Sequence, residues 1–329
     1  MTAMRNKPAL YVALVIFLAP AMLYGEIYRW VDEDGRVHFS ENAPARQTSE
    51  EITSKLDEVG NFFDFTHVVD IDWYIPSADY QPAEVEVKIE LVNYQLNAAE
   101  YNKIRDGVSG IYETYSRWFT WPRTPRQPVV IKIFGKFDAF EQYQQEEYIG
   151  HSTTRSHYSH QRKEVVMLGT EFKGATLGVL FHEASHAVFA MKLKSAPKWI
   201  NEGLAECFEG TQVRPDKIYL HYNPAWVETM KHKLREGSLR PMEEYLRISN
   251  KQWSGSSARV ERTYYIVAWS MMSSLLSSRH GIDTLRVVLA NLPSKSWRKE
   301  DGLVALFNDA YPGGVRKMDQ DWRHWIESM

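Results

Sequence analysis

The stretch FHEASHAVFA, residues 181–190, places two histidines and a glutamate within a run of otherwise apolar or small side chains. His182 and His186 are four residues apart, so on a helix their imidazoles lie one turn apart on the same face. Two neutral imidazole nitrogens in that position can bind one small cation, while Glu183 beside them is free to act on a water molecule. This His-Glu-x-x-His pattern predicts a single zinc ion bound by His182 and His186, with Glu183 as general base.

A catalytic zinc ion has three protein ligands and one open position, so a third ligand is expected downstream. WINEGLAECFEG, residues 199–210, offers Glu202 and Glu206 four residues apart on one face of a predicted helix. Pro197 reverses the chain after the first helix, which lets the second helix bring Glu202 back toward the histidines. We predict Glu202 as the third ligand, and Glu206 as the acceptor of the remaining ring N–H of a ligand histidine. The alternative for this pair is a solvated acidic face of an amphipathic helix.

Together, HEASH (182–186) and WINEGLAE (199–206) resemble the zinc-binding elements of the gluzincin metallopeptidases, and in particular those of the peptidase MA-like family. The similarity extends from about residue 90 to the C-terminus. It implies a zincin-like fold and hydrolysis of peptide bonds by a metal-activated water. The glutamate of the family's Asn-Glu-Gly element ligates zinc, and here that residue is Glu202. The 15 residues between His186 and Glu202 are fewer than in the aminopeptidase branch, and the sequence has no Gly-x-Met-x-Asn element, so an endopeptidase is favoured.

Peptide hydrolysis also needs a group that stabilises the carbonyl oxygen as it gains negative charge. The family resemblance implies Tyr265, four residues before Trp269-Ser270, as this catalytic residue. The alternative is a tyrosine packed at the start of a helix with its hydroxyl in water.

A histidine-containing segment, GHSTTRSHYSHQRK (150–163), precedes the His-Glu-x-x-His helix. Its histidines, at positions 151, 157 and 160, could form a second metal site or bind substrate. Their spacing matches no metal-binding template, which favours a polar surface loop. Cys207, the one cysteine of the chain, is expected in the core.

The N-terminus has the pattern of an export signal. Arg5 and Lys7 precede ALYVALVIFLAPAML (9–23), an apolar stretch short for a membrane span, so we predict a signal peptide over residues 1–25. Cleavage is expected after Ala21 or Gly25. The protein is then exported, to the periplasm of a Gram-negative cell; the alternative is an uncleaved N-terminal membrane anchor.

The next stretch, EIYRWVDEDGRVHFSENAP (26–44), predicts a β-hairpin, because two β-prone runs flank a turn that ends in Asp34-Gly35. It resembles a short domain of unknown function that is common in exported Gram-negative proteins. Residues 26–60 are therefore expected to form a small hairpin domain and a polar linker. A cell-envelope component is a possible partner of this hairpin.

Residues 61–329 are predicted to form the gluzincin-like domain, with an α+β fold. A mixed β-sheet subdomain packs on the active-site helix and is followed by a mainly helical C-terminal half. The expected strands lie within 66–93, at 129–135 and at 164–168, and the expected helices at 97–120, 137–145, 176–194, 198–209 and beyond 224. Thr176 is the expected N-cap of the helix 176–194.

Composition limits the choice of function. The chain has 329 residues, of which 44% are hydrophobic and 25% charged, and a formal net charge of −3. These values indicate a globular protein and do not favour a nucleic-acid partner. The leading hypothesis is a zinc peptidase of the cell envelope that acts on a peptide or protein. The alternative is a catalytically silent envelope-binding or structural protein on the same fold; the sequence does not indicate an oligomeric state.

Overall fold

The computed structural model describes residues 81–147, 156–169, 174–209 and 223–329, together with short strands at 28–31, 37–40, 50–51, 68–71, 212–213 and 218–221. The predicted signal peptide and most of the predicted linker lie outside the described residues. Within the described part of the chain, no helix combines the length and the apolar character needed to cross a bilayer.

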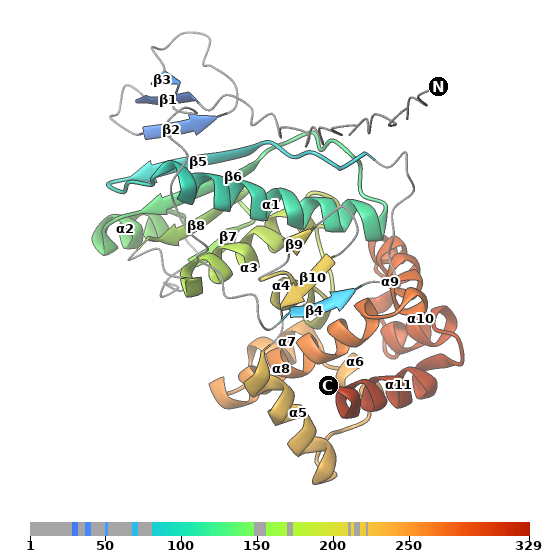
Figure 1. The fold of residues 1–329 in the computed structure, drawn as a ribbon. Coiled ribbons are helices and arrows are strands. Elements are labelled where there is room, and N and C mark those ends of the chain that lie inside the picture. The colour runs from blue at the N-terminus through green and yellow to red at the C-terminus, as the bar shows by residue number, and fades with distance from the viewer. Residues whose placement is uncertain are drawn as a thin grey trace, which may run out of the picture.

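A mixed sheet forms one side of the molecule (Figure 1). Among the described residues it has seven strands in the order β3-β1-β2-β5-β6-β8-β7. Their bounds are β1 Tyr28–Val31, β2 Val37–Ser40, β3 Glu50–Glu51, β5 Val87–Val92, β6 Val129–Phe134, β7 Ser156–Ser159 and β8 Glu164–Leu168. The central strands β5, β6 and β8 are parallel, and the outer pairings are antiparallel. Parallel neighbours need long crossovers, and the connection from β5 to β6 contains helix α1, Ala98–Phe119.

Helix α1 follows its prediction closely at both ends. Asn97 and Glu100 form a reciprocal capping box at its start, and Thr120 in the left-handed conformation ends it. Gly107 and Gly110 lie inside this helix and do not break it. A Cβ at Gly107 would lie 2.1 Å from Cζ of Phe181, so this glycine allows α1 to pack closely on the helix that carries the His-Glu-x-x-His pattern.

That helix is α3, Gly174–Ala190, and it is followed by α4, Lys198–Phe208. The prediction placed the first helix at 176–194 with Thr176 as N-cap, and this was wrong at both ends. Thr176 lies inside the helix, and the chain leaves it at Ala190, where a turn closes through hydrogen bonds to the carbonyl of Phe189. The second helix agrees with its predicted start, with Pro197 at the N-cap.

The described part of the histidine-containing segment, residues 156–163, is not the surface loop that its polarity favoured. Ser156–Ser159 forms β7, which pairs antiparallel with β8 and is the edge strand of the sheet. Lys163, at a φ of 58°, completes the tight turn between the two strands. The strand was missed because it contains no alternation of apolar and polar residues.

The predicted N-terminal hairpin is present, since β1 pairs with β2 in the register Tyr28 to Ser40 and Val31 to Val37. Strand β2 also pairs with β5, where Phe39 lies opposite Ile89. The hairpin therefore extends the main sheet. A second sheet of the described residues joins β4 (Val68–Ile71), β10 (Ile218–His221) and β9 (Gln212–Val213).

The C-terminal half is helical, as predicted, so the chain has a mixed α+β fold. Its helices are α5 Pro224–Arg235, α6 Met242–Leu246, α7 Asn250–Ser254, α8 Ala258–Leu276, α9 Arg279–Asn291, η2 Leu292–Ser294, η3 Ser296–Arg298, α10 Gly302–Ala310 and α11 Gly314–Ser328. Helix α4 packs on α8 so closely that a Cβ at Gly203 would lie 2.7 Å from the carbonyl oxygen of Ala268. Helices α3 and α4 thus lie between the sheet and the C-terminal helices (Figure 1).

Candidate metal centre

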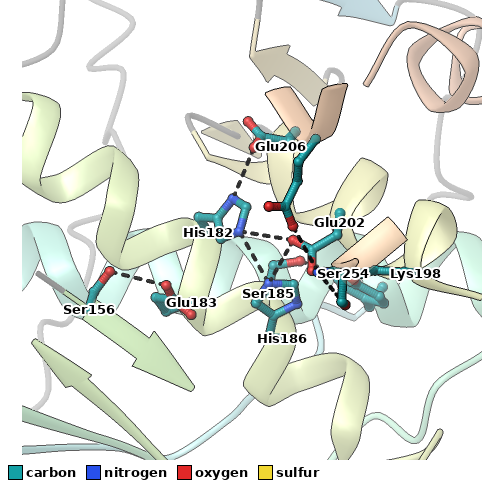
Figure 2. A network of polar contacts seen from close by, with 11 residues as sticks. Ser156, His182, Glu183, Ser185, His186, Lys198, Glu202, Glu206 and Ser254 are labelled. Atoms are coloured by element: carbon teal, nitrogen blue, oxygen red, sulfur yellow. Dashed lines mark hydrogen bonds and ion pairs between the residues drawn. The ribbon is translucent and has the colours of Figure 1, made fainter. Parts of the chain in front are cut away.

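Two neighbouring helices bring the predicted ligands together. His182 and His186 lie one turn apart on α3, and Glu202 faces them from the first turns of α4 (Figure 2). The two Nε2 atoms are 3.2 Å apart, and each lies 3.5 Å from Oε2 of Glu202. Among the described residues, these three side chains form the cluster that could hold a metal ion.

The charges in this cluster are strongly coupled because little water reaches them. Burial lowers the pKa of His182, but its hydrogen bond with Glu202 and the charges of Glu206 and Glu183 outweigh this and raise the pKa to about 10. Burial also raises the pKa of Glu202, yet the charge of His186 and the hydrogen bonds with both histidines hold it well below its usual range. Positive charge is therefore favoured between these groups, and a proton or a metal cation can supply it.

The histidine nitrogens that face away from the cluster differ in their surroundings. Nδ1 of His182 lies 3.7 Å from Oε1 of Glu206, which is an ion-pair distance and longer than a hydrogen bond. Burial raises the pKa of Glu206 to about 8, with His182 opposing this and Glu209 and Glu202 adding to it. Nδ1 of His186 is buried and has no hydrogen-bond partner among the described residues. Glu206 thus lies beside the His182 ring without the predicted hydrogen bond, and Nδ1 of His186 has no such neighbour among the described residues.

Glu183 lies on the side of α3 that faces the edge of the sheet. Its Oε1 accepts a hydrogen bond of 3.1 Å from Oγ of Ser156 on β7. Figure 2 shows this pair on the opposite side of His182 from Glu206. Sequence reasoning missed Ser156, since a serine in a polar segment 27 residues away carries no pattern that links it to the helix.

Tyr265 is carried by α8, and its ring packs edge-on against Trp253 at 5.4 Å between centroids. Burial raises its pKa, and the charges of Glu202, Glu261 and Glu206 raise it further. Its hydroxyl is therefore held protonated and within the electrostatic reach of the cluster. No described contact joins Tyr265 to His182, His186 or Glu202, and its role as the oxyanion donor stays a prediction.

A cavity of about 280 Å³ lies beside the cluster. Its lining includes His186 and Glu202 from the cluster, Asn201 and Lys198 from α4, and Asn250 from α7. His160 lines it from the turn that follows β7, and its pKa is lowered by burial and by the charge of His186.

His157, the other described histidine of segment 150–163, does not join His160. His157 places Nδ1 3.2 Å from the amide nitrogen of buried Gln144, and His151 lies outside the described residues. The described residues therefore form no second metal site from this segment. Cys207 is buried, as predicted, with Sγ 3.2 Å from Oγ of Ser273.

Comparison with known proteins is informative for the N-terminus. Residues 14–55 match the model of a domain of unknown function, DUF4124. This match covers the hairpin stretch, 26–44, that resembled such a domain, and it ends well before α3 and α4. No curated protein and no solved structure matches the chain.

Proposed function

We propose that the protein is a zinc-dependent endopeptidase of the gluzincin type, exported to the cell envelope. The observation that carries the proposal is the triangle of His182 Nε2, His186 Nε2 and Glu202 Oε2, with sides of 3.2, 3.5 and 3.5 Å. Zinc bonds of about 2.1 Å in tetrahedral geometry separate the ligand atoms by about 3.4 Å. Two imidazoles and one carboxylate are also a typical catalytic donor set, with one position left for water. The residues therefore fit zinc.

The chemistry divides between the metal and the chain. A bound zinc ion lowers the pKa of its water and polarises the scissile carbonyl. Glu183 accepts the proton of the attacking water and delivers it to the leaving amine. Ser156 holds the Glu183 carboxylate through its hydroxyl, and Tyr265 donates a hydrogen bond to the carbonyl oxygen as negative charge develops there.

The edge of the main sheet at β7 is an argument for a peptide as the substrate. Strand β7 is an edge strand, and it carries Ser156 directly beside Glu183. An extended peptide can add to such an edge through main-chain hydrogen bonds, which hold it without selecting its side chains. Because a strand edge can bind the middle of a chain, it favours cleavage within a polypeptide over removal of terminal residues.

Export is supported by the N-terminal pattern of basic residues followed by an apolar stretch. A purely structural role for a metal is less well supported. Structural zinc sites are usually closed by four protein ligands that include cysteine, whereas this cluster has three ligands beside an intact Glu183.

The proposal is tested with the purified, zinc-loaded protein and a mixture of peptides from a digested proteome. We expect hydrolysis within peptides that a chelator abolishes and zinc restores. Glu183→Gln should keep its zinc and lose turnover by about 10²-fold or more, since general-base catalysis contributes that much. Glu141→Gln, the same change on α2 (Phe137–Glu147), is the matched control. Wild-type turnover in Glu183→Gln would contradict the mechanism.

A further inference from the structure

A second and larger cavity, of about 700 Å³, adjoins the cleft beside the cluster. It lies between the start of α4, the turn from α6 to α7, and the segment from η3 to α10. Asn250 lines both cavities, and Pro197 of the larger cavity is adjacent to Lys198 of the smaller one. The side chain of Asn250 also holds the backbone at the start of α4, because it accepts a hydrogen bond from Lys198 N and donates one to Ala196 O. The two cavities therefore meet at the N-terminus of the helix that carries Glu202.

The lining of the larger cavity combines an apolar floor with a charged rim. Leu246 and Leu303 are almost fully buried, and Trp297 is packed against the core with its Nε1 bonded to the Leu292 carbonyl. Apolar walls of this kind lower the local dielectric and strengthen the field of charges at the rim. A ligand with both an apolar stem and a charged end fits such a lining.

The rim is positively charged even though the chain as a whole carries a net charge of −3. Arg247 is paired with both Asp301 and Glu243, each at 2.7 Å, so this group of three side chains carries one net negative charge. Lys251 and Lys299 are exposed and have no ionic partner among the described residues.

Arg298 links this rim to the cleft. Its guanidinium lies over the Trp297 ring and donates a 2.6 Å hydrogen bond to neutral Ser195, which lines the smaller cavity. Lys251, Lys299 and Arg298 are thus three cations opposed by Glu300 and by the surplus carboxylate of the Arg247 group, which leaves the rim with one net positive charge.

We propose that this cavity is a substrate subsite that binds an acidic side chain of the peptide, a few residues from the bond that is cleaved. The subsite rests on the proposed peptidase function and adds a substrate class to it, peptides with Asp or Glu on one side of the scissile bond. The positive rim attracts the carboxylate, the apolar floor covers its aliphatic stem, and Asn250 and Arg298 connect the subsite to the cleft.

Binding to an inactive protein tests the subsite without requiring turnover. The probes are a decapeptide of alternating Ala and Glu and its Ala-Gln counterpart, and the protein is the zinc-loaded Glu183→Gln chain. We expect the acidic peptide to bind about tenfold more tightly at low salt, with an advantage that shrinks as salt is added.

Charge reversal of the two rim lysines tests whether the tighter binding of the acidic peptide arises at this cavity. Lys251→Glu with Lys299→Glu should remove the tenfold advantage, because both lysines face the subsite and neither touches the cluster. Lys136→Glu with Arg316→Glu makes the same change in net charge at exposed positions outside both cavities and should keep the advantage. Equal affinity for the two peptides, or an equal loss in both double variants, would overturn the subsite.

Hydrolysis assays with protein that keeps Glu183 distinguish a failure of the proposed subsite from a failure of the proposed peptidase function. The lysine double variant should raise KM for peptides that contain Glu and leave kcat unchanged, since the lysines are remote from the reacting atoms. Zinc-dependent cleavage without any acidic preference would overturn the subsite and leave the peptidase intact. Lysine-dependent binding of the acidic peptide without hydrolysis of any peptide would overturn the peptidase and support the acidic-ligand site.

Discussion

At the scale of single residues, the cluster is defined by the small, largely buried volume that its few charged groups share. The His182 ring faces Glu202 at Nε2 and Glu206 at Nδ1. A buried imidazole between carboxylates keeps its proton, and a metal ion must displace that proton to bind. The same contacts that prepare the site for a cation therefore make metal binding depend on pH.

Metal affinity should rise with pH, by about tenfold per unit between roughly pH 7 and 9, because binding releases one proton. The folded-state pKa of His182, about 10, exceeds the ordinary value of 6.5. Protonated His182, paired with Glu202, therefore stabilises the folded metal-free protein. This stabilisation is complete below pH 6.5 and is lost as the pH rises toward 10. Competition with a zinc indicator across this range measures the slope; a flat profile would contradict the protonated cluster.

The hydroxyl of Ser156 should affect kcat and should not affect the zinc content. In Ser156→Ala the Glu183 carboxylate loses the donor that orients it, and a hydrogen bond to a charged group is worth about 1.5–3 kcal/mol. We expect kcat to fall about tenfold at unchanged zinc content. Ser156→Thr, which keeps the hydroxyl, should restore most of the rate. Equal activity of the alanine and threonine variants would show that Ser156 does not position Glu183.

The residues of the site differ in how far sequence could predict them. His182, His186, Glu202 and Glu206 follow helical spacing, so local geometry alone places each pair on one face. Ser156 and His160 reach the site through the pairing of β7 with β8, a contact set by the tertiary fold. The sequence named His160 as one of three candidate histidines but did not place it at this cluster, and no local pattern indicates Ser156.

At the scale of elements, the position of α4 decides whether Glu202 reaches the histidines. This helix has Pro197 at its N-cap and no capping side chain of its own. Asn250 of α7 supplies the missing acceptor, since its Oδ1 lies 2.7 Å from the amide nitrogen of Lys198. The bounds of α4 were predictable from Pro197 and helical spacing. Its cap was not predictable, because it comes from a residue 52 positions away.

Asn250→Ala should therefore weaken both the fold and the site. Loss of an N-cap costs about 1 kcal/mol of unfolding free energy. The matched control is Asn223→Ala, which removes the N-cap of α5, a helix whose residues do not line the cleft. We expect similar losses of stability in the two variants by denaturant titration, with weaker zinc binding only in Asn250→Ala. Equal zinc affinity in both would show that the cap does not position Glu202.

At the scale of the whole molecule, the cluster lies where two halves of the fold meet. Helix α3 packs on the sheet and on α1, while α4 packs on α8 of the helical half. The sequence predicted both halves, because strand alternation and helical periodicity are local. It did not predict that the N-terminal hairpin adds to the main sheet, since the pairing of β2 with β5 joins segments about 50 residues apart.

A metal that joins α3 to α4 should stabilise the whole fold. A ligand at a hundred times its Kd adds about 2.7 kcal/mol to the free energy of unfolding. For a protein of 329 residues that corresponds to a rise in Tm of about 4 °C. Differential scanning fluorimetry should show this rise with zinc in the wild type and in Glu183→Gln, and not in Glu202→Ala. A full shift in Glu202→Ala would assign the third ligand to another residue.

The central claim is tested most directly by anomalous X-ray diffraction, at the zinc absorption edge, from crystals of the protein grown with zinc. The account predicts one strong peak about 2.1 Å from Nε2 of His182, from Nε2 of His186 and from a carboxylate oxygen of Glu202. The absence of a peak between α3 and α4, or a peak that Glu202 does not reach, would contradict it.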